Sequence, residues 1–273
     1  MLRIAGTLGC SARNRFNLLK PNSAACIKRR GGAMLASMLR RPLFLALIAL
    51  AAPAHAADRS YVVTNFDRVR VDGPYSVQVE IGTGGAAASA SGDERALGDL
   101  DISVNGSTLT VRKGSQGWGE RGKASGPPPV ITLRTPAVRG ATVVGGARLA
   151  LAGALRTTRL DLQVTGAGVI DARGVDADDV VVTVIGNGNV ALAGRTARAR
   201  FSTNGGGSIA ATALDAGEIV VTLEGAGETR ASARYLADLT NKGLGLIAVS
   251  GRPKCTIRGQ SVGPIECGTE TPR

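Results

Sequence analysis

Short segments of alternating apolar and polar residues follow one another along most of the chain. In residues 75–81 the apolar side chains occupy every second position, which is the period of a strand with one buried face. Asn105-Gly106 separates two such segments, 102–104 and 109–111, and this dipeptide favours a tight hairpin turn. Helical periodicity is weak everywhere. The pattern predicts an all-β protein that begins with strands and hairpins.

From about residue 141 onward the alternation belongs to an internal repeat, Gly-x-Gly-x-apolar. The final positions of its copies are 21, 20, 19, 20 and 18 residues apart, at Leu149, Ile170, Val190, Ile209, Thr229 and Ile247. A period near 20 is characteristic of solenoid coils. Two apolar columns recur at fixed offsets from these positions, namely Leu162, Val182, Phe201, Val221 and Leu239, and Ala172, Leu192, Ala211, Ala231 and Val249.

The columns predict that each coil contains at least two short strands with one face inward, separated by glycine corners. Stacked coils of this kind bury a continuous core. We therefore predict a right-handed β-helix or β-solenoid with coils of about 20 residues over about residues 141–268. A phosphate-binding loop is a poorer explanation of the glycines, because it needs a following helix and occurs once. The calcium-binding nonapeptide repeat is excluded because its aspartate is missing.

The N-terminal region has the pattern of a signal peptide over residues 38–56. Arg40-Arg41 precedes an apolar run over 43–52, which is too short to span a bilayer, and small residues lead up to Ala56. We predict cleavage after Ala56 and no transmembrane segment in the mature chain. Residues 1–37 lie upstream of this signal and are interpreted as untranslated or as part of a cleaved leader.

Removal of residues 1–56 changes the charge and the available chemistry. These residues hold nine of the 33 basic residues and none of the 21 acidic ones, so the net charge falls from +12 to about +3. A nucleic-acid partner is therefore not expected. The only histidine, His55, is also removed, which excludes a Ser-His-Asp arrangement and histidine-ligated metals. We expect no catalytic residues, no metal and no cofactor.

The cysteines indicate an oxidising compartment. Cys10 and Cys26 lie in the leader, which leaves Cys255 and Cys267. In an exported protein such a pair is expected to form a disulfide. We predict that it closes the C-terminal end, where a loop of this size contributes about 3 kcal/mol in the chain-entropy model.

A glycine- and proline-rich stretch over residues 114–129 predicts a long exposed loop. It contains the only tryptophan, Trp118, with Arg121 and Lys123 nearby. An aromatic side chain beside cations is a common binding arrangement for sugars or anionic partners. The alternative is a linker whose tryptophan packs back on the solenoid.

Superposing the coils also brings charged residues of opposite sign together. The period places Arg159 over Asp179 and Asp178 over Arg198. We interpret this either as a ladder of ion pairs along one corner or as a solvated face with charges of both signs, in which exposed pairs contribute little.

Residues 66–77, 91–93 and 109–111, together with the glycine-rich coils, resemble the head GIN domain family of auto-transporter adhesins. The resemblance covers about residues 60–268. It implies a signal peptide, a β-helix-like fold, an envelope or extracellular location and a role in adhesion, and it supplies no catalytic residues. A strand-rich translocator does not follow Cys267, so the periplasm and the cell surface both remain open as locations.

Two function classes follow from these features. The first is a non-enzymatic binding or structural module of the bacterial envelope, formed by a single domain over residues 57–273, with an envelope or extracellular glycan or a surface protein as partner. The second is a β-helical polysaccharide lyase or hydrolase, since such enzymes can use Asp, Arg and Lys without histidine.

Overall fold

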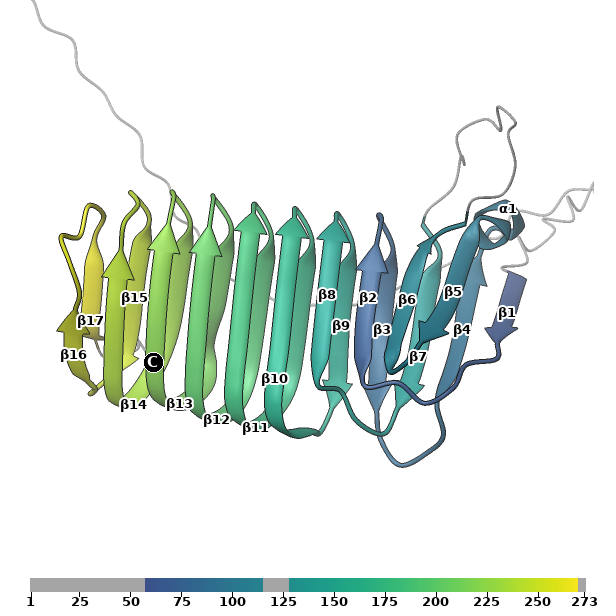
Figure 1. Cartoon of the computed structure of the whole chain (residues 1–273), viewed down its shortest axis with the longest axis horizontal. Coiled ribbons are helices and arrows are strands. Elements are labelled where there is room, and N and C mark those ends of the chain that lie inside the picture. The colour runs from purple at the N-terminus through teal and green to yellow at the C-terminus, as the bar shows by residue number, and fades with distance from the viewer. Residues whose placement is uncertain (1–56, 115–127, 270–273) are drawn as a thin grey trace, which may run out of the picture. The chain divides into compact units, whose positions relative to one another are not determined.

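The computed structural model describes residues 57–114 and 128–269, all of which belong to one compact unit, Pro53–Arg273. This unit is nearly all β and forms a solenoid of about six turns with coils of about 20 residues. The predicted fold class is therefore confirmed (Figure 1).

The N-terminal part consists of short strands and one short helix. These elements are β1 (Ala57–Tyr61), β2 (Arg68–Asp72), β3 (Ser76–Ile81), β4 (Ala87–Gly92), α1 (Glu94–Gly98), β5 (Leu100–Asn105), β6 (Thr108–Lys113), β7 (Val130–Thr135), β8 (Gly140–Gly145) and β9 (Arg148–Gly153). The predicted hairpin between β5 and β6 is antiparallel. Asn105 pairs with Thr108, so the turn is formed by Gly106 and Ser107, one residue later than predicted. Helix α1 was not predicted. Its five residues are too few to show a helical period, although Asp93 caps it by accepting from the Arg95 amide.

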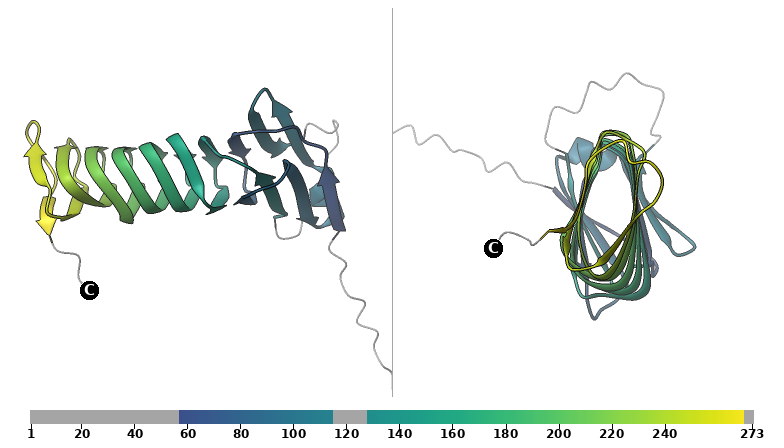
Figure 2. Two further views of the ribbon diagram at one scale, coloured as in Figure 1. Left: turned by 90° about the horizontal axis from the view of Figure 1, so that it is seen from below. Right: turned by 90° about the vertical axis from the view of Figure 1, so that its left-hand side faces the viewer.

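The C-terminal part consists of long strands that bend through the corners of the coils, followed by shorter ones. They are β10 (Leu155–Gly166), β11 (Val169–Gly186), β12 (Asn189–Asn204), β13 (Ser208–Glu224), β14 (Glu228–Asn241), β15 (Leu246–Gly251), β16 (Lys254–Ile257) and β17 (Ile265–Thr269). Viewed along the stacking axis, the coils superpose as two facing walls joined by corners (Figure 2).

Each wall is a parallel sheet whose strands come from successive coils. The first wall contains, in spatial order, β6, β2, β8, the C-terminal halves of β10 to β14, and β16. The second wall contains β7, β3, β9, the N-terminal halves of β11 to β14, β15 and β17. On the charged corner, which we define as residues 155–159, 175–179, 194–198 and 214–218, the chain passes from the second wall to the first.

Spatial order and chain order differ at the N-terminal end. Strand β2 lies between β6 and β8, and β3 lies between β7 and β9. The coil formed by β2 and β3 is therefore inserted between two coils that come later in the sequence. The strand β4 pairs antiparallel with β7, and β1 pairs with β4.

The core fills the space between the walls, and the two predicted columns point into it. Every member of both columns is at most 3% exposed. The largest of them is Phe201, which is 1% exposed and belongs to β12. Its coil neighbours in the register are Val182 and Val221. The inward columns are therefore continuous from coil to coil, as the repeat predicted.

Glycines form the corner between the first wall and the second. The first glycine of the third repeat, Gly186, has φ +104°, and a Cβ there would lie 2.9 Å from the carbonyl oxygen of Gly166 in the preceding coil. The amide of Asn187 donates to that same carbonyl at 2.9 Å. The corner thus needs glycine both for its left-handed backbone and for close stacking.

The predicted disulfide between Cys255 and Cys267 is confirmed, with a Cα–Cα distance of 6.4 Å. In the register, Cys255 lies over the inward residue Ala237, and Cys267 lies over the inward Val249. Because β16 belongs to the first wall and β17 to the second, the bridge joins the two walls in the last coil.

Candidate binding surface

The outer face of the first wall carries a column of polar side chains, one from each successive strand. The backbone register aligns Thr110, Arg70, Thr142, Gln163, Thr183, Ser202, Thr222 and Thr240. Because strand side chains alternate between faces, each of them stands between two inward core residues. Neighbouring members of the column are separated by about 4.8 Å, the spacing of strands in a sheet.

A shallow groove of about 350 Å³ lies on this face, where β2, β8, β10 and β11 run side by side. Arg68 and Arg70 form one side, and Asp161 and Gln163 lie across β8 from them. The remaining polar residues of its lining are Thr108, Thr142 and Thr183.

The groove owes its depth to Gly140, which occupies the outward position of β8 between Arg68 and Asp161. A Cβ at this glycine would meet only ordinary contacts, at 3.4 Å from the Asp161 carbonyl oxygen and 3.6 Å from Cγ of Arg68. Its backbone is not in the left-handed region. Unlike Gly186, Gly140 is therefore not required by the backbone. It is buried, and the side chain of Arg68 passes over it, with Nη1 at 3.9 Å from the position of a Cβ.

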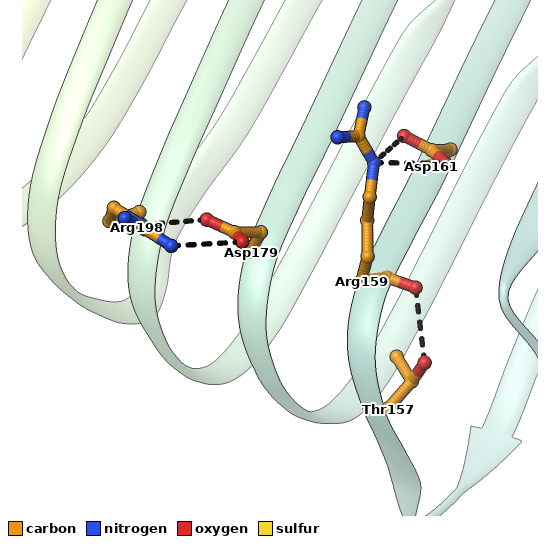
Figure 3. Close-up of polar contacts among 5 residues, drawn as sticks. All are labelled: Thr157, Arg159, Asp161, Asp179 and Arg198. Atoms are coloured by element: carbon orange, nitrogen blue, oxygen red, sulfur yellow. Dashed lines mark hydrogen bonds and ion pairs between the residues drawn. The ribbon is translucent and has the colours of Figure 1, made fainter.

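The electrostatics of the groove are dominated by its arginines. Within the described ranges, the side chains of Arg68 and Arg70 form no ion pair. The one carboxylate in the lining, Asp161, accepts from Nε of Arg159 at 3.0 Å (Figure 3). Its charge is thus balanced from outside the groove, and two uncompensated positive charges remain.

On the charged corner, one ion pair between coils forms among the residues that the period superposes, and its register differs from the predicted one. Arg159 lies over Asp179 as predicted, but Arg198 lies over Asp179 and not over Asp178. The register shifts by one residue between Arg173 and Val175, because Gly174 has no partner in the next coil. Arg198 donates to Asp179 at 2.7 and 3.1 Å (Figure 3). This raises the pKa of the Arg198 guanidinium. Arg159 instead pairs with Asp161 of its own coil.

A second charged column on the same corner was not predicted. Arg156, Asp176, Arg195 and Asp215 succeed one another in the register. Arg195 donates to both carboxylate oxygens of Asp176 at 2.8 Å, and these hydrogen bonds lower the pKa of Asp176. The residues are spaced at the repeat period, so the sequence contained this signal. The two columns tie neighbouring coils together along the corner.

Residues 65–253 match the model of a family that is described as "Putative auto-transporter adhesin, head GIN domain". The chain belongs to this family. The resemblance stated from the sequence is thereby confirmed. A search of curated proteins finds no match.

Solved structures show that the fold of this head GIN domain is shared. The chain is similar to a putative adhesin from Bacteroides fragilis, with 22% identity, a TM-score of 0.71, and coverage of 78% of this chain and 97% of that one. A putative lipid binding protein from Parabacteroides distasonis has 18% identity, a TM-score of 0.65 and coverage of 80% and 98%. A putative adhesin from the same organism has 17% identity, a TM-score of 0.60 and coverage of 78% and 97%. These likenesses establish the fold.

Several predicted features of the head GIN domain lie outside the described residues. They are the signal peptide over 38–56, its cleavage site at Ala56, and the loop residues Trp118, Arg121 and Lys123. Their roles stay predictions. In the part of the chain that the structure describes, no helix has the length and apolar character needed to cross a membrane.

The sequence did not predict the groove. Arg68 and Arg70 alternate with Val69 and Val71, which predicts that both arginines point outward. Nothing in the sequence indicated that this strand would pair with the distant Gly140 strand, and that pairing forms the groove.

Proposed function

We propose that this head GIN domain is an exported, non-enzymatic, adhesin-like module that binds a polysaccharide of the envelope or its surroundings along the first wall. The observation that supports this most directly is the outward polar column, which runs across β6, β2, β8 and the coils after them. Hydroxyl and amide side chains both donate and accept hydrogen bonds, as sugar hydroxyls do.

The rigidity of the wall supports binding of an extended polymer. From β2 to β14, each strand of this wall is fixed on both sides by parallel backbone pairing, so little conformational entropy is lost when the side chains meet a ligand. Individual contacts with hydroxyls are weak, but contacts repeated about every 4.8 Å along one polymer add together.

Export is supported by the disulfide between Cys255 and Cys267, because such bonds persist in oxidising compartments. The family description and the names of two structural relatives refer to adhesins. The predicted signal peptide agrees with both.

The pairing of carboxylates on the first wall favours a binding role over hydrolysis. Asp161 pairs with Arg159, Glu224 with Lys242, and Asp238 with Arg258. Glycoside hydrolysis uses two carboxyl groups that flank the scissile bond, whereas each of these carboxylates is engaged by a basic side chain.

The test is an array of envelope and extracellular glycans, probed with the purified exported protein. Replacing Thr183 and Thr222 with valine removes two hydroxyls from the column, and Thr212→Val removes an exposed one from the second wall. We expect the double variant to bind more weakly and Thr212→Val to bind as the wild type does. Binding lost only in Trp118→Ala would assign recognition to the 114–129 loop instead, and polymer cleavage would establish the lyase or hydrolase alternative.

A further inference from the structure

We propose that the groove around Gly140 is a subsite for carboxylate groups, so that the ligand of the first wall is an acidic polysaccharide containing uronic acids. This rests on the proposed function and adds the chemical class of the ligand. The groove, the two arginines without ion pairs and the polar lining each contribute a separate part of the argument.

The two arginines are placed to bind anions. They stand two residues apart on β2, so their Cα atoms are about 6.6 Å apart and their side chains leave the same face. A guanidinium donates two parallel hydrogen bonds to a carboxylate, which is the strongest common pairing for that group.

The register shows why these arginines have no protein partner. Arg68 lies between Thr108 and Gly140, and Arg70 lies between Thr110 and Thr142. All four neighbours are uncharged. On the charged corner, by contrast, Arg198 has carboxylates in both register neighbours, Asp179 and Glu218. The same fold therefore pairs arginines on one surface and leaves them available on another.

The lining favours a sugar over a lipid. Hydroxyl and amide groups from Thr108, Thr142, Gln163 and Thr183 surround the arginines. Of the large apolar lining residues, Val69 and Leu162 are at most 2% exposed because their side chains point into the core, and Val181 is half-buried on the outer face. A sugar ring would find hydrogen-bonding groups on several sides of the groove.

Gly140 makes room for the Arg68 side chain within the groove. At the same register position the preceding and following strands carry Arg68 and Asp161, and the next strand carries Val181. Because Gly140 has no side chain, the Arg68 side chain lies over this position and inside the groove, where a carboxylate could approach both guanidinium groups.

The experiment compares oligogalacturonate with the same oligosaccharide after complete methyl esterification, by isothermal titration calorimetry on the exported full chain. The ester keeps the sugar backbone and removes the charge. We expect the acid to bind at least about tenfold more tightly than the ester. We expect Arg68→Gln together with Arg70→Gln to abolish this preference and to leave the melting temperature unchanged.

Arg148→Gln is the matched control, because Arg148 is exposed on β9 of the second wall and lies between the uncharged Ser76 and Val169. It should leave the preference intact. Gly140→Val should weaken binding of the acid by filling the groove, and a Gly140→Ala variant with a smaller side chain should weaken it less.

Equal binding of the acid and the ester by the wild type would overturn the subsite while leaving a polysaccharide-binding wall in place. The same would follow if Arg148→Gln lost the preference for the acid as completely as the double arginine variant does. The protein could instead bind vesicles containing anionic phospholipid, lose this binding in the double arginine variant and not bind oligogalacturonate. That result would assign the groove to a lipid headgroup and not to a sugar. An array without any bound glycan would overturn the proposed function and the subsite together.

Discussion

The corner glycines give the sharpest test of the fold, and Gly186→Ala is the most informative change. An L-residue at φ +104° is strained by about 1–3 kcal/mol. The new Cβ would also lie 2.9 Å from the carbonyl oxygen of Gly166, and relieving such an overlap in a packed structure costs about 1–3 kcal/mol more. The variant should therefore lose about 2–6 kcal/mol of unfolding free energy.

The assay is urea unfolding followed by circular dichroism, with thermal unfolding in parallel. For a domain of this size each kcal/mol corresponds to about 2–4 °C, so the melting temperature should fall by at least about 4 °C. Gly146→Ala is the control, because a Cβ there has nothing within 4 Å and the backbone is not left-handed; it should change stability by no more than about 1 kcal/mol. Equal unfolding midpoints for the two variants would refute the reasoning about the corner.

Three further predictions concern the bridge, the charged corner and the core. Replacing Cys255 and Cys267 with alanine should lower the unfolding free energy by about 3 kcal/mol, measured by urea unfolding against the oxidised wild type. An unchanged midpoint would show that the disulfide does not stabilise the fold. Because Arg195 lowers the pKa of Asp176, the pair stabilises the fold above the unfolded-state pKa near 4, and this contribution disappears as the pH falls through the lower folded-state value. A carboxyl NMR titration of Arg195→Gln should show the Asp176 pKa moving upward, and no movement would exclude the pairing. Phe201→Ala should cost about 3–5 kcal/mol and Phe201→Leu clearly less, and similar thermal stability for both would argue against close packing at this position.

The sequence predicts those parts of the fold that depend on nearest neighbours in the repeat. Inward residues such as Phe201 were identified because each coil repeats the same alternation, and the disulfide followed from compartment and cysteine number. The hairpin between β5 and β6 was identified, to within one residue, because the backbone requirement of its turn is local. These features are encoded within a window of one or two coils.

The groove depends on a pairing that the local pattern does not determine. Strand β2 would pair equally well, by its alternation, with any strand of matching length, and its position between β6 and β8 is set by the packing of the whole N-terminal end. The predicted register of the charged corner was wrong because coil lengths vary. A shift of one residue makes Asp179, and not Asp178, the register partner of Arg198. Both errors concern alignment between elements that are distant in sequence.

Because the coils share one geometry, the length of the first wall depends on how many coils the chain contains. Adding or deleting one coil of about 20 residues would lengthen or shorten the polar column by one strand spacing, about 4.8 Å, while the glycine corners on either side keep their own contacts. The number of coils therefore sets the length of the polar column, and under the proposed function it would also set how many sugar units the wall binds at once.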